Sequence, residues 1–124
     1  IQNKSTINIM KSFRDSHTEE ERKKESSKIL QRYPSRVPII VEKKAGCSLG
    51  DIEKNKYLAP GDMSMSQFIF TVRRRIKLEP SEAIFLTVNG SLMSGSSLIS
   101  DVYESKKDKD GFLYMIYSSE NTFG

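Results

Sequence analysis

Few residues in this 124-residue chain have types and spacing that could do chemistry. Cys47 is the only cysteine and His17 the only histidine, and Cys47 lies in a Gly/Ser-containing segment without a Cys-x-x-Cys pair. A nucleophilic thiolate needs a neighbouring base or a positive field, so the sequence favours an ordinary loop cysteine. One Cys and one His also cannot supply the usual ligand sets of zinc, and we expect no metal site.

The segment Lys107–Gly111 (KDKDG) faintly resembles a calcium-binding loop. It lacks the third acidic position and the closing Glu of such loops, and its Asp-Gly pair is instead typical of a hairpin turn. The sequence contains neither a Gly-rich phosphate loop of the Walker type nor a paired-carboxylate motif. We therefore expect a binding role rather than an enzyme, with no cofactor held by the chain itself.

The net charge of +4 belongs to the first part of the chain. Residues 1–36 hold nine Lys or Arg and five Asp or Glu, whereas residues 37–124 hold eleven of each. Basic and acidic residues are interleaved in Glu19–Glu25, which is typical of a solvated helix face. We therefore expect no nucleic-acid partner, although the basic first part would suit an anionic membrane surface. The apolar runs, such as Val37–Val41, are too short to span a membrane.

Two capping boxes predict where helices begin. Thr18 with Glu21 opens a helix inside the helical stretch Lys11–Arg32, and Ser64 with Gln67 opens a second one. The second helix carries apolar residues at helical spacing, namely Met65, Phe68, Val72 and Ile76. That stripe predicts a helix packed on a core.

Four segments have the composition of strands, and they are Val37–Glu42, Tyr57–Ala59, Ala83–Val88 and Phe112–Tyr117. Asn89-Gly90 is the most favoured two-residue hairpin turn, and Ser96 or Ser97 can cap a short helix through Tyr103. The resulting order of elements predicts an α+β domain with a ubiquitin-like β-grasp fold, in which a four-stranded mixed sheet packs on a central helix.

We expect four segments along the chain. These are a flexible extension (1–10), an N-terminal helical region (11–35), the ubiquitin-like domain (36–118) and a flexible tail (119–124).

The segment Val37–Lys43 is expected to be an exposed sheet edge, since Pro38 favours an edge position or a strand start. An extended peptide could add a strand to such an edge through backbone hydrogen bonds. Aliphatic and aromatic residues nearby in the sequence (Tyr57, Leu58, Pro60, Met63) would then form pockets, or they are simply part of the core.

Several blocks of the sequence together closely resemble the autophagy ubiquitin-like modifiers of the GABARAP type. The blocks are Arg36–Lys43, Asp51–Leu58, Gln67-Phe68 with Arg73–Ile76, Asp110–Tyr114 and Tyr117–Gly124. They agree in order and spacing over nearly the whole chain, from about Met10 to Gly124. The resemblance implies a β-grasp fold with two additional N-terminal helices.

The resemblance also implies a role for Gly124. Members of the family are adenylated at a C-terminal glycine by an activating enzyme that uses ATP, pass to a conjugating enzyme as thioesters, and end as an amide on phosphatidylethanolamine. A cysteine protease processes and delipidates them. The implied protein is a monomer when unconjugated, is cytoplasmic, and is associated with autophagosome membranes after lipidation. The sequence ends on Gly124, as a processed form or one that needs no processing would.

The family binds receptors and adaptors through peptides of the form aromatic-x-x-aliphatic, and the resemblance implies which residues contact them. The aromatic pocket is implied at Glu25, Ile29, Pro38, Lys56, Leu58 and Phe112. The aliphatic pocket is implied at Tyr57, Ala59, Pro60, Met63, Phe68 and Thr71. The strand that pairs with the peptide is implied at Ile39, Ile40, Val41, Glu42 and Lys43. Contacts to acidic residues that flank the motif are implied at Arg36, Lys54 and Arg75.

The chain departs from the family pattern at Ala59 and Thr71, where larger aliphatic residues are usual, so the aliphatic pocket is expected to be wider or shallower. A non-conjugated β-grasp peptide-binding module, such as a trafficking adaptor, stays open as the alternative function.

Overall fold

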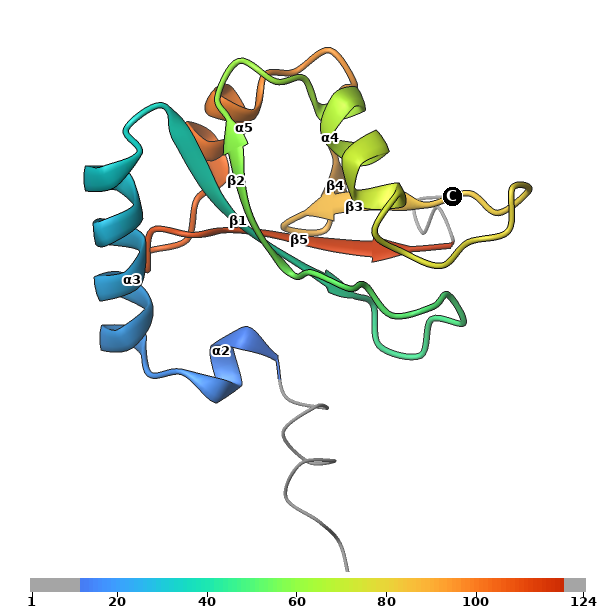
Figure 1. The fold of residues 1–124 in the computed structure, drawn as a ribbon, viewed down its shortest axis with the longest axis horizontal. Coiled ribbons are helices and arrows are strands. Elements are labelled where there is room, and N and C mark those ends of the chain that lie inside the picture. Colours follow the sequence, from blue (N-terminus) through green and yellow to red (C-terminus); the bar gives the residue numbers. More distant parts are fainter. Residues whose placement is uncertain (1–11, 120–124) are drawn as a thin grey trace, which may run out of the picture.

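The computed structural model describes residues 12–119 (Figure 1). The expected flexible extension of residues 1–10 and the terminal Gly124 lie outside the described residues. The helices are α2 (Phe13–Ser16), α3 (Glu19–Arg32), α4 (Met65–Arg73) and α5 (Ile99–Lys106). The strands are β1 (Arg36–Lys43), β2 (Lys56–Pro60), β3 (Phe85–Val88), β4 (Ser91–Leu92) and β5 (Leu113–Ser118).

The strands form one mixed sheet in the order β2-β1-β5-β3-β4. Strands β1 and β5 are parallel, and the other neighbouring pairs are antiparallel. The β-grasp prediction is confirmed, but the predicted number of four strands is wrong. Asn89 and Gly90 both have positive φ, at 51° and 79°, as the predicted hairpin turn requires. This turn places Ser91 opposite Val88 and so adds the two-residue strand β4.

The prediction that Val37–Lys43 forms an exposed edge is wrong. Strand β1 lies inside the sheet, with β2 on one side and β5 on the other. Pro38 fits there because it lies opposite Leu58 and one residue before the pairing with β5 begins at Ile39. The amide hydrogen that proline lacks would therefore point beyond the end of the β5 ladder.

The strand implied to pair with a peptide, Ile39–Lys43, is therefore occupied by other parts of the chain. All five residues pair with β5, and Ile39, Ile40 and Val41 are fully buried. The Glu42 carboxylate accepts a hydrogen bond from the Phe13 amide at 2.7 Å. This site assignment is corrected, because an added strand needs backbone groups that no neighbouring strand uses.

Both predicted capping boxes are present. The Thr18 hydroxyl accepts from the Glu21 amide at 3.1 Å, and the Glu21 carboxylate accepts from the Thr18 amide at 2.7 Å. Ser64 and Gln67 make the same reciprocal pair at the start of α4. Because Thr18 starts a new helix, the helical stretch Lys11–Arg32 divides into α2 and α3, which are the two additional N-terminal helices.

The predicted cap of the short helix is wrong. Helix α5 follows Leu98, which makes no side-chain capping bond. The Ser97 carbonyl accepts a hydrogen bond from the Met65 amide at 2.9 Å, and Leu98 forms a bridge with Ser64. Because Ser97 and Leu98 make these contacts with the start of α4, α5 begins only at Ile99. Contacts between such distant segments could not be predicted from the sequence near α5.

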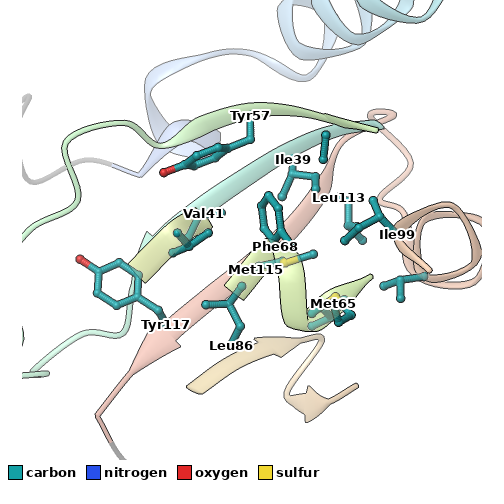
Figure 2. Close-up of a cluster of buried hydrophobic side chains, with 14 of the residues drawn as sticks. Ile39, Val41, Tyr57, Met65, Phe68, Leu86, Ile99, Leu113, Met115 and Tyr117 are labelled. Atoms are coloured by element: carbon teal, nitrogen blue, oxygen red, sulfur yellow. The ribbon is translucent and has the colours of Figure 1, made fainter. Parts of the chain in front are cut away.

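The sheet carries apolar clusters on both faces, because successive β1 side chains point to opposite sides. The main core lies between the sheet and helices α4 and α5, where Phe68 and Ile99 pack over β1 and β5 (Figure 2). On the other face, a smaller cluster of Phe13, Ile40 and Phe112 is joined by Ile29 and Tyr114. Helix α3 thus covers one face of the sheet and α4 the other.

Candidate functional site

Strand β2 is one end of the sheet and pairs with β1 alone among the strands that the structure describes. The Val41 amide donates to the Asn55 carbonyl at 2.7 Å. Backbone groups in an antiparallel pair alternate in direction, so those of Tyr57 and Ala59 face β1, whereas those of Lys56 and Leu58 face outward. The Leu58 carbonyl already accepts a hydrogen bond from the Arg36 guanidinium at 3.3 Å. The open edge is therefore β2, the neighbour of the strand expected from the sequence.

The six residues implied for an aromatic pocket lie on the α3 side of this edge. Leu58 lies opposite Pro38, and Lys56 lies opposite Ile40, which packs with Ile29 and Phe112. Glu25 reaches from α3 to form an ion pair with Lys56. Phe112 is fully buried, so it can form only the floor of such a pocket.

The residues implied for an aliphatic pocket divide into two groups. Tyr57, Ala59 and Phe68 are buried in the main core, so, like Phe112 on the other face, they can form at most the floor of such a pocket. Pro60, Met63 and Thr71 line an open hollow of about 590 Å³ on the α4 side of β2.

The hollow has four further lining residues that the sequence reasoning missed, namely Asp62, Ser66, Gln67 and Phe70. Phe70 is the most exposed large apolar residue among those described, at 61%. It falls outside the apolar stripe that carries Phe68 and Val72 into the core. An apolar residue off the stripe was a signal in the sequence that could have identified this part of the surface.

The three implied bases lie around β2. Arg36 is exposed at the start of β1, opposite Pro60. At the other end of β2, the Lys54 ammonium lies 5.4 Å from the centroid of the Tyr57 ring. Burial raises the pKa of the Tyr57 hydroxyl to about 12, against a smaller lowering by the charge of Arg75. Positive charge is thus available near both ends of the open edge.

Cys47 lies in a loop, as expected, and its thiol is 3.9 Å from the Ser119 hydroxyl. Burial raises the pKa of this thiol, but hydrogen bonds from the Leu49 and Ser119 backbones and the charge of Lys43 outweigh it, so that the pKa is lowered. Among residues 12–119, no group of three or more His, Cys, Asp or Glu side chains could hold a metal ion.

The Lys107–Gly111 segment forms a turn, with the Gly111 amide donating to the Asp108 carbonyl at 3.0 Å. Its two carboxylates are directed at arginines, since Asp108 pairs with Arg14 at 2.9 Å and Asp110 with Arg22 at 2.6 Å. This arrangement supports the turn rather than the calcium-loop interpretation. None of the helices within residues 12–119 is long and apolar enough to cross a membrane.

Comparisons with known proteins agree with the fold and with the resemblance. The family model described as "Autophagy protein Atg8 ubiquitin like" matches residues 21–124. Autophagy-related protein 8B of Oryza sativa subsp. indica is 50% identical over 113 residues, which cover 91% of this chain and 95% of the relative. Autophagy-related protein 8h of Arabidopsis thaliana is 46% identical over 116 residues, covering 94% and 98%. The crystal structure of Trypanosoma brucei ATG8 has a TM-score of 0.83 at 39% identity, covering 92% of this chain and 98% of that one.

Proposed function

The chain belongs to the Atg8 family of ubiquitin-like autophagy proteins, and we propose that it is a lipid-conjugated modifier that captures aromatic-x-x-aliphatic peptides at the β2 edge. The main observation that supports this proposal is the open edge of the sheet at β2. Lys56 and Leu58 present backbone groups outward, and the two faces beside them offer different chemistry.

The spacing of the peptide motif matches this arrangement. Side chains of an extended strand alternate between its faces, so residues three apart point to opposite sides. When a peptide adds a strand to β2, its aromatic residue would reach the α3 side, where Leu58 and Ile29 lie. Its aliphatic residue would reach the hollow beside Met63 and Thr71 on the α4 side. The partners are therefore receptors and adaptors that carry such motifs.

Charge supports the same proposal. Arg36 stands at one end of β2 and Lys54 at the other, with Arg75 close to Tyr57. Acidic residues that flank the peptide motif would meet these bases, which contribute chiefly to the rate of association because they are exposed to solvent.

The lipid is attached through Gly124 in this proposal, and the match to the family model extends through that residue. An activating enzyme would adenylate the Gly124 carboxylate with ATP, and a conjugating enzyme would carry it as a thioester. The amine of phosphatidylethanolamine would then displace the thiol to form an amide. The chain is thus a substrate rather than a catalyst, and it binds no cofactor of its own. A cysteine protease would reverse the linkage.

Two acyl chains would hold the protein on the autophagosome membrane, because each buried CH₂ contributes about 0.8 kcal/mol. Before conjugation the protein would be a cytoplasmic monomer. Glycine suits the attachment, because without a Cβ its carboxylate can enter a narrow active site.

Reconstituted conjugation tests the lipid proposal. The wild-type chain and Gly124→Ala are incubated with activating enzyme, conjugating enzyme, ATP and phosphatidylethanolamine vesicles, and the lipid-linked product is measured by mass spectrometry. We expect product from the wild type and none from Gly124→Ala. Leu58→Ala is the matched control and should be lipidated normally, because it changes only the edge. Equal lipidation of Gly124→Ala and wild type would refute the assigned attachment.

The alternative is a peptide-binding module of the same fold that is never conjugated, such as a trafficking adaptor. The observation in its favour is that the edge is formed by β2 with α3 and α4 on its two sides, so peptide binding there would not need Gly124. Mass spectrometry of the C-terminus isolated from cells distinguishes the two, since a form that persists without lipid would support the adaptor.

A further inference from the structure

A charged cluster is buried between α3 and the start of β5. Asp110 is 1% exposed, and its carboxylate accepts three hydrogen bonds. They come from the Arg22 guanidinium at 2.6 Å, the Tyr114 hydroxyl at 2.5 Å and the Phe112 amide at 2.8 Å. Burial and the hydrogen bond to Asp110 raise the pKa of the Tyr114 hydroxyl, which keeps it a donor.

Ser26 makes a second connection between the same elements. It lies one turn after Arg22 on α3, and its buried hydroxyl donates to the Asp110 carbonyl at 2.6 Å. The next residue, Gly111, has a φ of +91°, and a Cβ there would lie 2.3 Å from the Ser26 hydroxyl oxygen. The close approach of α3 to this turn therefore requires glycine at position 111. We call Arg22, Ser26, Asp110 and Tyr114 the Asp110 cluster.

The Asp110 cluster is continuous with the aromatic side of the β2 edge. Ile29 follows Ser26 by three residues, on the same face of α3, and packs against the cluster that contains Phe112. Glu25, one residue before Ser26, forms the ion pair with Lys56 on β2. Asp110 itself holds the Phe112 amide. The contacts that fix α3 thus also fix the floor and one wall of the aromatic side.

We propose that Arg22, Ser26 and Tyr114 are positioning residues, which through Asp110 set the separation of α3 from β2 and β5 and so select which aromatic side chain the edge accepts. This inference rests on the proposed peptide binding. The hollow on the α4 side contains no residue of α3 or of the Asp110 cluster. Loosening the cluster should therefore change selection at the aromatic position and leave selection at the aliphatic position unchanged.

Titration calorimetry with four synthetic peptides tests this selectivity. The peptides carry Trp or Phe at the aromatic position, and Leu or Val at the aliphatic position. In Arg22→Gln we expect the Trp/Phe ratio of Kd values to change about threefold or more, with the Leu/Val ratio unchanged. Lys23→Gln is the matched control, because it removes an exposed ion pair with Glu19 on the same helix. Both ratios should match wild type in that variant.

We compare ratios of Kd values because a smaller folded fraction weakens the binding of all four peptides by the same factor. That factor cancels in the Trp/Phe and Leu/Val ratios. If both ratios stay at their wild-type values in Arg22→Gln, the cluster only stabilises the fold and the inference is overturned. Ser26→Ala removes a single hydroxyl and gives the same comparison should Arg22→Gln fail to fold.

A readout without peptide separates this inference from the proposed function. The Ile29 methyl groups, packed against the Phe13–Ile40–Phe112 cluster, should show ring-current shifts in a methyl NMR spectrum. We expect these shifts to decrease in Arg22→Gln and to persist in Lys23→Gln. Unchanged shifts in Arg22→Gln would overturn the positioning role. If the shifts decrease but wild type binds none of the peptides, the positioning of α3 stands and the proposed peptide binding is wrong.

Discussion

Lys56 on β2 forms an ion pair with Glu25 on α3, and both side chains are partly buried, at 40% and 32% exposure. The pair spans from the open edge to the helix that covers the aromatic side. Removing either residue therefore changes both the charge and the shape of the entrance to that side. The Lys56–Glu25 ion pair also links β2, whose backbone groups are open, to α3, which the Asp110 cluster holds in place.

The first prediction concerns this entrance. Leu58→Ala removes apolar surface from the α3 side of β2 and should weaken binding of an aromatic-x-x-aliphatic peptide about tenfold. Lys56→Ala should weaken peptide binding less, about threefold, because the ion pair of Lys56 with Glu25 is partly screened by solvent. Lys24→Ala, an exposed lysine on α3, serves as the control. If titration calorimetry gives the wild-type Kd for both Leu58→Ala and Lys56→Ala, the assignment of peptide binding to this edge is wrong.

The second prediction distinguishes a core residue, Phe68, from a surface residue, Thr71, among those implied for the aliphatic pocket. Phe68→Leu should lower the unfolding free energy by about 1–2 kcal/mol because the smaller side chain leaves a cavity in the core, without changing the Leu/Val preference of the bound peptide. Thr71→Leu narrows the hollow and should shift that preference toward Val about threefold, at a stability cost under about 0.5 kcal/mol. Urea denaturation and titration calorimetry measure the two effects. The reverse pattern would show that Phe68 contacts peptide.

The third prediction follows from two buried tyrosines that differ in hydrogen bonding. The Tyr57 hydroxyl is buried without a hydrogen-bond partner among the described residues, whereas the Tyr117 hydroxyl donates to the Gly50 carbonyl at 2.7 Å. Tyr57→Phe should be neutral or stabilising at neutral pH, and Tyr117→Phe should cost about 1–2 kcal/mol. Urea denaturation of both variants provides the comparison. A larger loss in Tyr57→Phe would mean that its hydroxyl is hydrogen-bonded in solution.

The fourth prediction is a loss of stability at alkaline pH. Burial raises the pKa values of Tyr57 and Tyr117 to about 12, whereas tyrosine in an unfolded chain titrates near pH 10. Between these values the unfolded state releases protons that the folded state retains. The unfolding free energy therefore falls as the pH rises from about 10 to about 12.

Denaturation curves across that range check the prediction. Tyr57→Phe removes one of the tyrosines whose pKa is raised by burial, so its stability should decline less steeply with pH than that of wild type. Identical slopes for the two proteins would show that Tyr57 does not contribute.

The local elements of this fold could be predicted from the sequence because their causes lie within a few residues. The capping boxes at Thr18 and Ser64 each satisfy amides three residues away. The Asn89-Gly90 turn depends on the backbone freedom of two adjacent residues. The apolar spacing of α4 is set by the helical repeat, and the order of elements then indicated the β-grasp fold.

Only the tertiary structure decided which strand is the edge and which residues line the hollow beside it. Pro38 suggested an edge, but its missing amide hydrogen is accommodated inside the sheet by the register with β5. Phe70 lies off the apolar stripe of α4, but only the fold places its exposed side chain in one hollow with Pro60 and Met63. These outcomes depend on pairings between distant segments, whose register is fixed by the packing of the whole domain. The sequence by itself determined the family, the starts of α3 and α4 and the basic N-terminal part, while long-range packing decided the start of α5, the edge, the hollow and the Asp110 cluster.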